Sequence, residues 1–206
     1  MASSVGSAIT IDFADTENPV IEKMDFDLAD MGCALCIVDV GGNHADLTHE
    51  YAAIPAEMKQ VASFFGKEVL RGVTIRELLD NAKPIREQFG DRAFLRAFHF
   101  INENERVGEI VAAIRQKDYA AFNRLIIESG NSSFRYLQNV YANPAPAEQG
   151  MSIALAIAER VLAGCGSWRV HGGGFGGTTQ NFVPFDKLPE FRREIEAVFC
   201  EGRCHI

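Results

Sequence analysis

Five glycines stand within six residues near the C-terminal end of the chain, in the segment Gly172–Gly177. Glycine loses more conformational freedom on folding than any other residue, so such a run is costly unless the backbone needs positive φ angles or a close approach. Strand-like segments flank it at Ser167–His171 and Thr178–Val183. We therefore predict a β-turn-β unit, which a helix beginning inside the glycine run would contradict.

The glycine run has two interpretations that the residues alone leave open. It is either a loop packed against a ligand, with backbone amides available to bond anions, or a tight hairpin turn with a bulge. It is not a Walker loop, because no Gly-Lys-Ser/Thr follows it. It is not the dinucleotide fingerprint either, because a strand and not a helix follows the glycines.

The remaining pattern predicts an α+β fold around an antiparallel sheet. Ser7–Phe13 alternates apolar and polar residues, and Cys33–Val40 is almost continuously apolar, which is typical of a central strand. The remaining segments have helical patterns. We predict a helix at Tyr51–Phe65 with Pro55 in its first turn, and a short helix that the capping box Thr74–Glu77 opens and Pro84 stops. Further helices are predicted at Asp91–Lys117, capped by Asp91, at Tyr119–Glu128, capped by Asp118, at Ala147–Ala163, and at Asp186–Phe199, capped by Asp186.

Composition excludes several classes of protein. The net charge of -8 repels phosphate backbones, so nucleic acid is not an expected partner. The longest apolar stretch, Cys33–Val40, is too short to cross a bilayer, and Met1–Ala8 lacks the charged and apolar regions of a signal peptide. We expect a cytoplasmic protein with a sizeable core and no membrane partner.

The five cysteines are expected to be reduced thiols, because their number is odd. Cys33 and Cys36 lie three apart on a predicted strand, so their side chains point to opposite faces and belong to the core. Cys200, Cys204 and His205 supply only three potential ligands, whereas a structural zinc site needs four. We therefore expect no metal site and assign no metal ligand.

Two further segments offer polar groups. Gly41–Tyr51 leaves a predicted central strand and enters a helix; His44, Asp46, His49 and Tyr51 have hydrogen-bonding groups suited to a sugar. The alternative is a polar turn in which Asp46 or Thr48 caps the helix. Glu128–Ser133 is rich in hydroxyls, and turn chemistry at a helix end is its favoured interpretation.

Three segments resemble galactokinases of the GHMP kinase superfamily, in the same order as in that family. The first segment is Cys36–His44, followed seven residues later by Tyr51, and it resembles the family's strand and Ser-Gly-Val-x-His … Glu-Tyr segment. The second, Phe122–Ser129, is similar to the family's Gly-x-Leu-Met-x-Glu-Ser helix. The third, Arg169–Gly177, looks like the third GHMP motif. The matches span most of the chain. Val40, Asn43 and His171 depart from the residues usual in the family.

The resemblance implies that residues 1–206 form a GHMP kinase C-terminal domain, a ferredoxin-like antiparallel sheet with helices on one face. It implies that Tyr51 hydrogen-bonds the sugar and that Gly173 lines the sugar pocket. In the complete enzyme, ATP with Mg²⁺ would phosphorylate the anomeric hydroxyl of galactose. Galactose or a related hexose is thus the expected ligand.

The family's first motif, its phosphate-binding loop and its catalytic aspartate have no counterpart in these 206 residues. We therefore expect no catalytic or cofactor-binding residue in this chain, no cofactor for the isolated chain, and no catalysis by it alone. A stand-alone sugar-binding or regulatory module is the alternative. In that family one face of this domain is buried against the N-terminal lobe. We therefore expect a partner to cover the corresponding face here, either a complementary N-terminal lobe or a second copy in a homo-oligomer.

Overall fold

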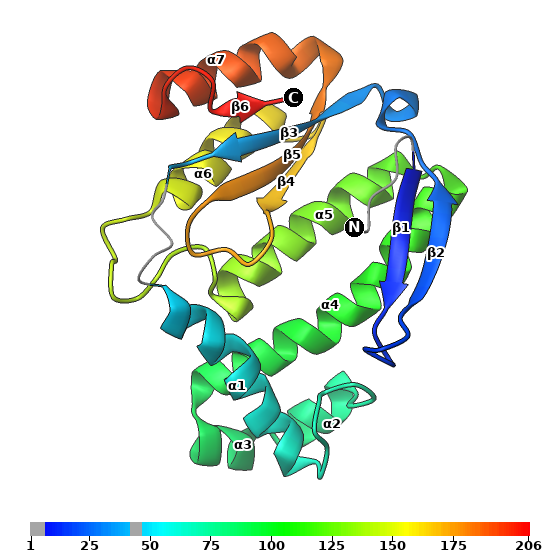
Figure 1. The fold of residues 1–206 in the computed structure, drawn as a ribbon, viewed down its shortest axis with the longest axis vertical. Helices are drawn as coiled ribbons and strands as arrows, with labels where there is room; N and C mark the ends of the chain where they lie inside the picture. Colours follow the sequence, from blue (N-terminus) through cyan, green and yellow to red (C-terminus); the bar gives the residue numbers. More distant parts are fainter. Residues whose placement is uncertain (1–6, 42–46) are drawn as a thin grey trace.

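The computed structural model describes residues 7–41 and 47–206 and combines two antiparallel sheets with a set of helices (Figure 1). The strands are β1 Ser7–Asp12, β2 Val20–Asp25, β3 Cys33–Asp39, β4 Ser167–Val170, β5 Thr178–Pro184 and β6 Cys204–His205. The α-helices are α1 Thr48–Phe64, α2 Ile75–Asp80, α3 Ala82–Phe89, α4 Asp91–Gln116, α5 Tyr119–Ser132, α6 Gly150–Leu162 and α7 Leu188–Phe199. None of the helices in these ranges is long and apolar enough to cross a membrane.

The main sheet has the strand order β4-β5-β3-β6, and every neighbouring pair is antiparallel. The expected central strand is indeed internal, between β5 and β6. Helices α6 and α7 cover one face of this sheet (Figure 1) and bury the main apolar cluster there. That cluster comprises Cys36, Val38, Ala154, Ala158, Val161, Leu162, Val183, Phe191, Ile195 and Cys204. The predicted α+β architecture is confirmed.

The glycine run joins β4 directly to β5, and the two strands pair antiparallel from Ser167 opposite Phe182 to Val170 opposite Thr179. The predicted β-turn-β unit is therefore confirmed, and no helix begins inside the run. On the second face of the sheet, Phe182 packs edge-on against Phe122 of α5, with ring centroids 5.0 Å apart. This contact joins the unit to α5.

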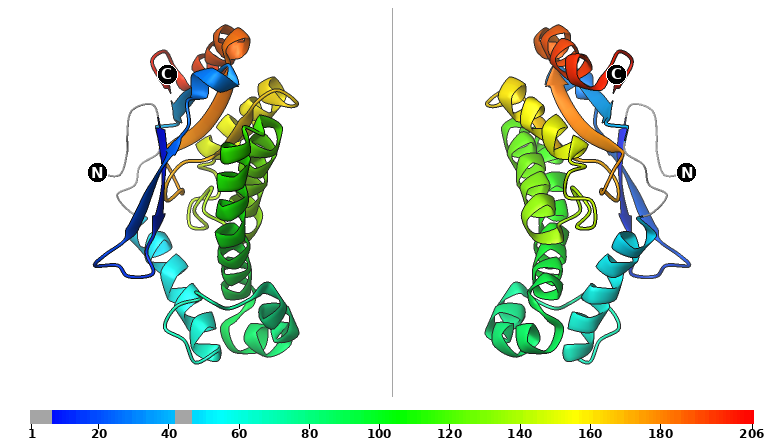
Figure 2. Two further views of the ribbon diagram at one scale, coloured as in Figure 1. Left: turned by 90° about the vertical axis from the view of Figure 1, so that its right-hand side faces the viewer. Right: turned by 90° about the vertical axis from the view of Figure 1, so that its left-hand side faces the viewer.

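A second, two-stranded sheet pairs β1 with β2. The sequence predicted β1 but not β2, because the charged residues Glu22, Lys23 and Asp25 interrupt its apolar pattern. Met24 alone of this strand is buried, in a cluster that includes Phe122 and Ile114. Figure 2 shows this hairpin beside the long antiparallel helices α4 and α5.

Several predicted helix boundaries are wrong. Helix α1 begins at Thr48, so Pro55 lies inside it and not in its first turn. Pro84 does not stop the helical region; it is the third residue of α3, where a missing N–H is tolerated. Gly90, not Asp91, is the N-cap of α4. Helix α6 starts at Gly150 and α7 at Leu188, the latter after a short 3₁₀ turn that contains Asp186.

Helix α5 also runs beyond its predicted end. The segment Glu128–Ser133, interpreted from sequence as turn chemistry, is helical and leads into a π-helical turn at Ser133–Leu137. The buried hydroxyls of this segment find partners on α4: Ser132 Oγ lies 2.9 Å from His99 Nδ1, and Ser129 hydrogen-bonds Glu103. Tertiary partners therefore replace the local backbone bonds that would have ended the helix.

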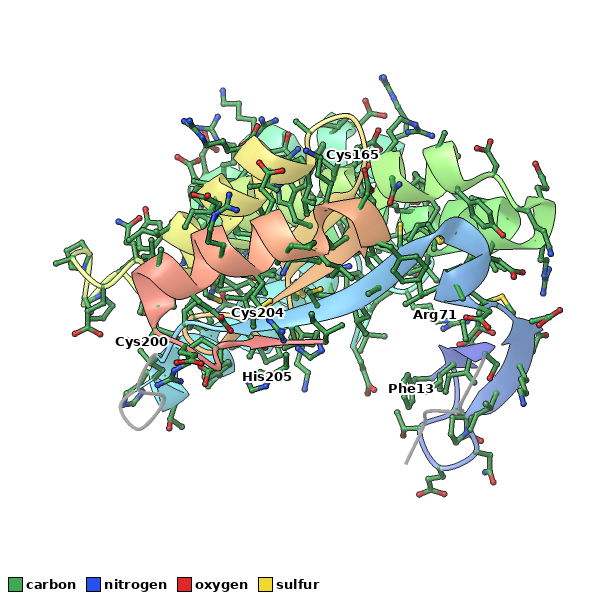
Figure 3. All side chains as sticks on the ribbon, turned by 90° about the horizontal axis from the view of Figure 1, so that it is seen from above. Phe13, Arg71, Cys165, Cys200, Cys204 and His205 are labelled. Carbon is green, nitrogen blue, oxygen red and sulfur yellow. The ribbon has the colours of Figure 1, made fainter. Side chains whose placement is uncertain are left out.

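The cysteines are all free. Cys33 and Cys36 are both buried in β3, as the strand pattern predicted. Cys204 is buried in β6, whereas Cys165 and Cys200 are exposed at separate helix ends (Figure 3). Among the residues the structure describes, no three His, Cys, Asp or Glu side chains gather as a metal site would require.

Candidate functional site

The loop between β4 and β5 is fastened at its base by two backbone hydrogen bonds. His171 N donates to Thr178 O (3.0 Å), and Val40 N donates to Gly177 O (2.9 Å), which ties the loop to the end of the central strand β3. Within the loop Phe175, a non-glycine residue, holds a φ of 60°. An L-residue in this conformation is strained and persists only where its surroundings hold it. Phe175 is 6% exposed, so packing holds it.

Tyr51, in the first turn of α1, packs directly on this loop. Its hydroxyl donates a hydrogen bond to Gly174 O at 2.7 Å, and its ring meets the Phe175 ring edge-on, with centroids 5.2 Å apart. A Cβ on Gly173 would lie only 2.9 Å from Tyr51 Cε1. The absence of a side chain at Gly173 is therefore what lets the tyrosine ring approach the loop.

Tyr51 and Gly173, the two residues that the resemblance nominated for sugar binding, are thus in contact, although more than a hundred residues separate them. Burial raises the pKa of Tyr51 above its ordinary value, so the phenol stays protonated at neutral pH and remains a hydrogen-bond donor. That proton is directed at Gly174 O, so the hydroxyl joins α1 to the glycine loop.

Asn139 contacts the loop from another element, and the sequence had not singled it out. It follows the π-helical turn after α5 and is 2% exposed. Its side-chain Nδ2 donates to Gly173 O (3.2 Å), and its backbone oxygen accepts from Phe175 N (2.5 Å). No motif marks this residue; only its packing on the glycine loop reveals it.

A pocket of about 320 Å³ opens beside the loop. This volume is at the lower end of the range for small-molecule sites. Among the described residues its walls are mainly apolar, and Glu148 is the one carboxylate. The lining residues are Val40, Gly41, Leu47, Val140, Ala142, Ala145, Glu148, Gly150, Met151, Phe175 and Gly176.

The other candidates from the same segment fall outside this arrangement. His44 and Asp46 lie outside the described residues. His49 is exposed on α1, and Thr48 does not cap the helix through its side chain. Asp39, at the end of β3, instead accepts a hydrogen bond from Gly41 N (2.8 Å) and pairs with Arg203. The Gly41 amide and the Arg203 guanidinium hold the pKa of Asp39 below its ordinary value.

The chain is similar to galactokinases over most of its length. It is 31% identical to human galactokinase over 192 residues, which are 93% of this chain and 44% of that protein. It is 30% identical to the galactokinase of Bos taurus over 191 residues and to that of Actinobacillus pleuropneumoniae serotype 3 over 164 residues, again 44% and 41% of those proteins. The chain therefore spans less than half the length of these relatives. No protein-family model matches it.

The fold agrees with these similarities. The crystal structure of Lactococcus lactis galactokinase complexed with galactose superposes with a TM-score of 0.74 at 21% identity, covering 96% of this chain and 48% of that one. The described parts of the three segments that resemble galactokinases lie on β3 and α1, on α5, and on β4 with the β4–β5 loop. The similarities in sequence and in fold support the interpretation of this chain as a C-terminal part of a galactokinase.

Proposed function

We propose that residues 1–206 are the C-terminal domain of a galactokinase-like sugar kinase and form part of its sugar-binding wall. The observation that carries this proposal is the contact of Tyr51 with Gly173 and Gly174. It brings together a phenolic hydroxyl and backbone groups, which are the kinds of group that hydrogen-bond sugar hydroxyls. The next loop residues, Phe175 and Gly176, line the pocket, whereas Tyr51, Gly173 and Gly174 are not among its lining residues. In the complete enzyme, galactose or a related hexose would be phosphorylated at its anomeric hydroxyl.

ATP and Mg²⁺ belong to the reaction of the complete enzyme and supply the phosphoryl group and the charge that balances it. The two side chains of the described residues that hydrogen-bond the loop at Gly173 and Gly174 are uncharged, the phenol of Tyr51 and the amide of Asn139. Such groups suit a sugar better than a metal ion, so we assign no ATP or Mg²⁺ contact to these residues. Their role would be to bind and orient the sugar.

We infer that the 206-residue polypeptide does not phosphorylate galactose by itself. A sugar hydroxyl is a poor nucleophile and needs a positioned carboxylate, while the phosphoryl group needs a cradle of donors and a metal. Loss of one such element typically costs about two to three orders of magnitude in rate.

The relatives' similarity also favours a cytoplasmic, reducing environment, in keeping with five free cysteines.

Two measurements on the purified 206-residue chain test this proposal. NMR titration with galactose, with glucose as the comparison sugar, should show galactose binding that Tyr51→Ala removes. A coupled ADP-release assay with galactose, Mg²⁺ and ATP should show no galactose-dependent turnover.

Turnover that survives repurification and is lost on Tyr51→Ala would show that the chain is an enzyme in its own right. Binding without turnover even when the chain is part of a full-length protein would favour a sugar-binding or regulatory module. A chain that binds no hexose would contradict the sugar-facing role of Tyr51 and Gly173 in this polypeptide.

A further inference from the structure

Asn139 forms two hydrogen bonds with the glycine loop, one on each side of Gly174. Its side-chain Nδ2 donates to Gly173 O, and its backbone oxygen accepts from Phe175 N. Between these bonds Gly174 passes so close that a Cβ there would lie 2.0 Å from Asn139 O and 2.7 Å from Nδ2. Gly174 also has a φ of 82°, which favours glycine. Only glycine therefore fits at position 174, because the backbone oxygen of residue 139 already leaves no room for a Cβ.

Tyr51 holds the same three loop residues by different atoms. Its hydroxyl bonds Gly174 O, its ring lies against Gly173, and its edge meets Phe175. Three consecutive loop residues are thus held between a tyrosine on α1 and an asparagine that follows α5. The position of Gly173 relative to the Tyr51 ring depends on both contacts.

The hydrogen bond from Nδ2 to Gly173 O determines which way the side-chain amide of Asn139 points. Its Oδ1 is buried and has no hydrogen-bond partner among the described residues, whereas Nδ2 bonds Gly173 O. Flipping the amide would place Oδ1 against the Gly173 carbonyl oxygen, and two acceptors repel one another.

The segment that carries Asn139 is itself braced. Gln138, the preceding residue, has a φ of 59° and turns the chain out of the π-helical segment. One residue earlier, Leu137 O accepts a hydrogen bond from Nε of Arg96, a side chain 1% exposed on α4. Asn139 therefore reaches the loop from a rigid support, as a residue that sets the geometry of a site requires.

We propose that Asn139 is a positioning residue of the sugar site: through its Nδ2 bond to Gly173 O it holds the glycine loop at the distance from Tyr51 that sugar binding requires. This inference rests on the proposed function, because the sugar is the ligand whose affinity it would set. It adds a residue on a third element to the site formed by α1 and the β4–β5 loop.

Asn181 provides a matched control. It is also fully buried, its Oδ1 also has no partner among the described residues, and its Nδ2 also donates to a backbone carbonyl, Cys36 O, at 3.1 Å. That bond joins β5 to β3 within the main sheet, away from the glycine loop. Asn139→Asp and Asn181→Asp each replace an amide donor by an isosteric carboxylate that repels its carbonyl partner.

The experiment compares the wild-type chain with these two variants at a temperature where circular dichroism shows all three folded. Hydrogen exchange read by NMR should show faster exchange of the amides of residues 172–177 in Asn139→Asp only. Galactose titration should show affinity about tenfold weaker for Asn139→Asp than for Asn181→Asp, the size expected for one lost polar contact. Asn139→Ala, which removes the donor without adding charge, serves if Asn139→Asp fails to fold.

Each result is decisive. Unchanged loop exchange in the Asn139 variants, or equal loss of affinity in the Asn139 and Asn181 variants, would overturn the proposal. Altered loop exchange with unchanged galactose affinity would also overturn it, because Asn139 would then be only structural. If the wild-type chain binds no galactose, the sugar role fails together with the proposed function, while the exchange data still decide whether Asn139 holds the loop.

Discussion

The hydroxyl of Tyr51 donates a hydrogen bond to the carbonyl oxygen of Gly174, 2.7 Å away and 123 positions later in the chain. A bond of this kind contributes about 1 kcal/mol to stability. Its larger consequence is geometric, since it joins the first turn of α1 to the loop between β4 and β5. Tyr51, from one of the two candidate ligand segments of the sequence, thus lies directly on the other, the glycine loop.

The contact at Gly173 predicts a specific loss of ligand affinity. Gly173→Ala would place a Cβ 2.9 Å from Tyr51 Cε1, and the ring, held by Gly174 and Phe175, would have to move. We expect galactose affinity to fall about tenfold or more, equivalent to ~1.4 kcal/mol. The measurement is NMR or calorimetric titration of the folded variant.

Gly172→Ala is the control for this change. Its Cβ would meet nothing within 4 Å, although its φ of 66° makes the variant strained, by about 1 kcal/mol. It should therefore lose stability but keep most of its galactose affinity. Equal affinities for the two variants would show that the contact with Tyr51 is irrelevant to binding.

The buried His99 should make the protein less stable in mild acid. Burial lowers the pKa of His99 to about 4, helped by the positive Arg169 and Arg106 and opposed by Glu103. The unfolded chain, with an ordinary histidine pKa near 6.5, binds more protons between these values, so stability falls as the pH drops from about 6.5 to about 4. The contribution lost is up to about 3 kcal/mol.

Urea unfolding at pH 7 and pH 4.5 measures this effect. His99→Gln should lose less stability between the two pH values than the wild-type chain does. His205→Gln, which changes an exposed histidine in β6, should lose as much as the wild type. If His99→Gln and wild type respond to pH alike, another group is responsible for the acid sensitivity.

A buried ion pair between Arg96 and Glu57 joins α4 to α1. The Arg96 side chain is 1% exposed, and its Nη1 lies 3.0 Å from Glu57 Oε2, with Arg92 on the same carboxylate. Glu57→Ala would leave the Arg96 guanidinium buried without its counter-charge. We expect the free energy of unfolding to fall by about 3–5 kcal/mol in urea melts.

Asp91→Ala is the comparison for Glu57→Ala. Asp91 pairs with Arg86 where both side chains are more than half exposed, so its removal should have no measurable effect on stability. A Glu57→Ala variant as stable as Asp91→Ala would mean that Arg96 finds another partner or reaches water.

The hairpin β1–β2 predicts self-association of the 206-residue chain. Phe13, Val20 and Ile21 are 57–59% exposed. Phe13 and Val20 line a groove of about 730 Å³ together with Val69, Phe100 and Val107. Figure 3 shows Phe13 at the hairpin, remote from the end of the molecule that carries Cys200. Apolar surface of this kind tends to be covered, here by a second copy.

Light scattering and sedimentation velocity test the association. The double change Val20→Lys with Ile21→Lys should yield a monomer, whereas Val198→Lys, at an equally exposed apolar residue of α7, should not change the oligomeric state. Added salt should strengthen association, because it screens the net charge of -8. A wild-type chain that is monomeric at high concentration would contradict the prediction.

Local features of the sequence were sufficient where the interactions are themselves local. Thr74 and Glu77 form the predicted capping box, and the Asp118 side chain accepts from Ala121 N as the predicted cap of α5. The glycine run between two strand-like segments is the predicted β-turn-β unit. In each case the stabilising groups lie within a few residues of one another, so their spacing along the chain carries the information.

Features that depend on distant partners were missed or wrong. The hydroxyl-rich end of α5 stays helical because its serines hydrogen-bond to α4, Ser129 to Glu103 and Ser132 to His99. β2 pairs with β1 despite its charged residues, because Met24 reaches a cluster built from other elements.

The sequence by itself determined the antiparallel α+β architecture and the turn at the glycine run, while the resemblance to galactokinases nominated Tyr51 and Gly173. Only the tertiary structure brought Tyr51 onto that loop and added Asn139 beneath it, a residue without any motif. The physical reason is that hydrophobic periodicity and turn chemistry act over a few residues. The geometry of a site is instead decided by packing and hydrogen bonds between segments far apart in the chain.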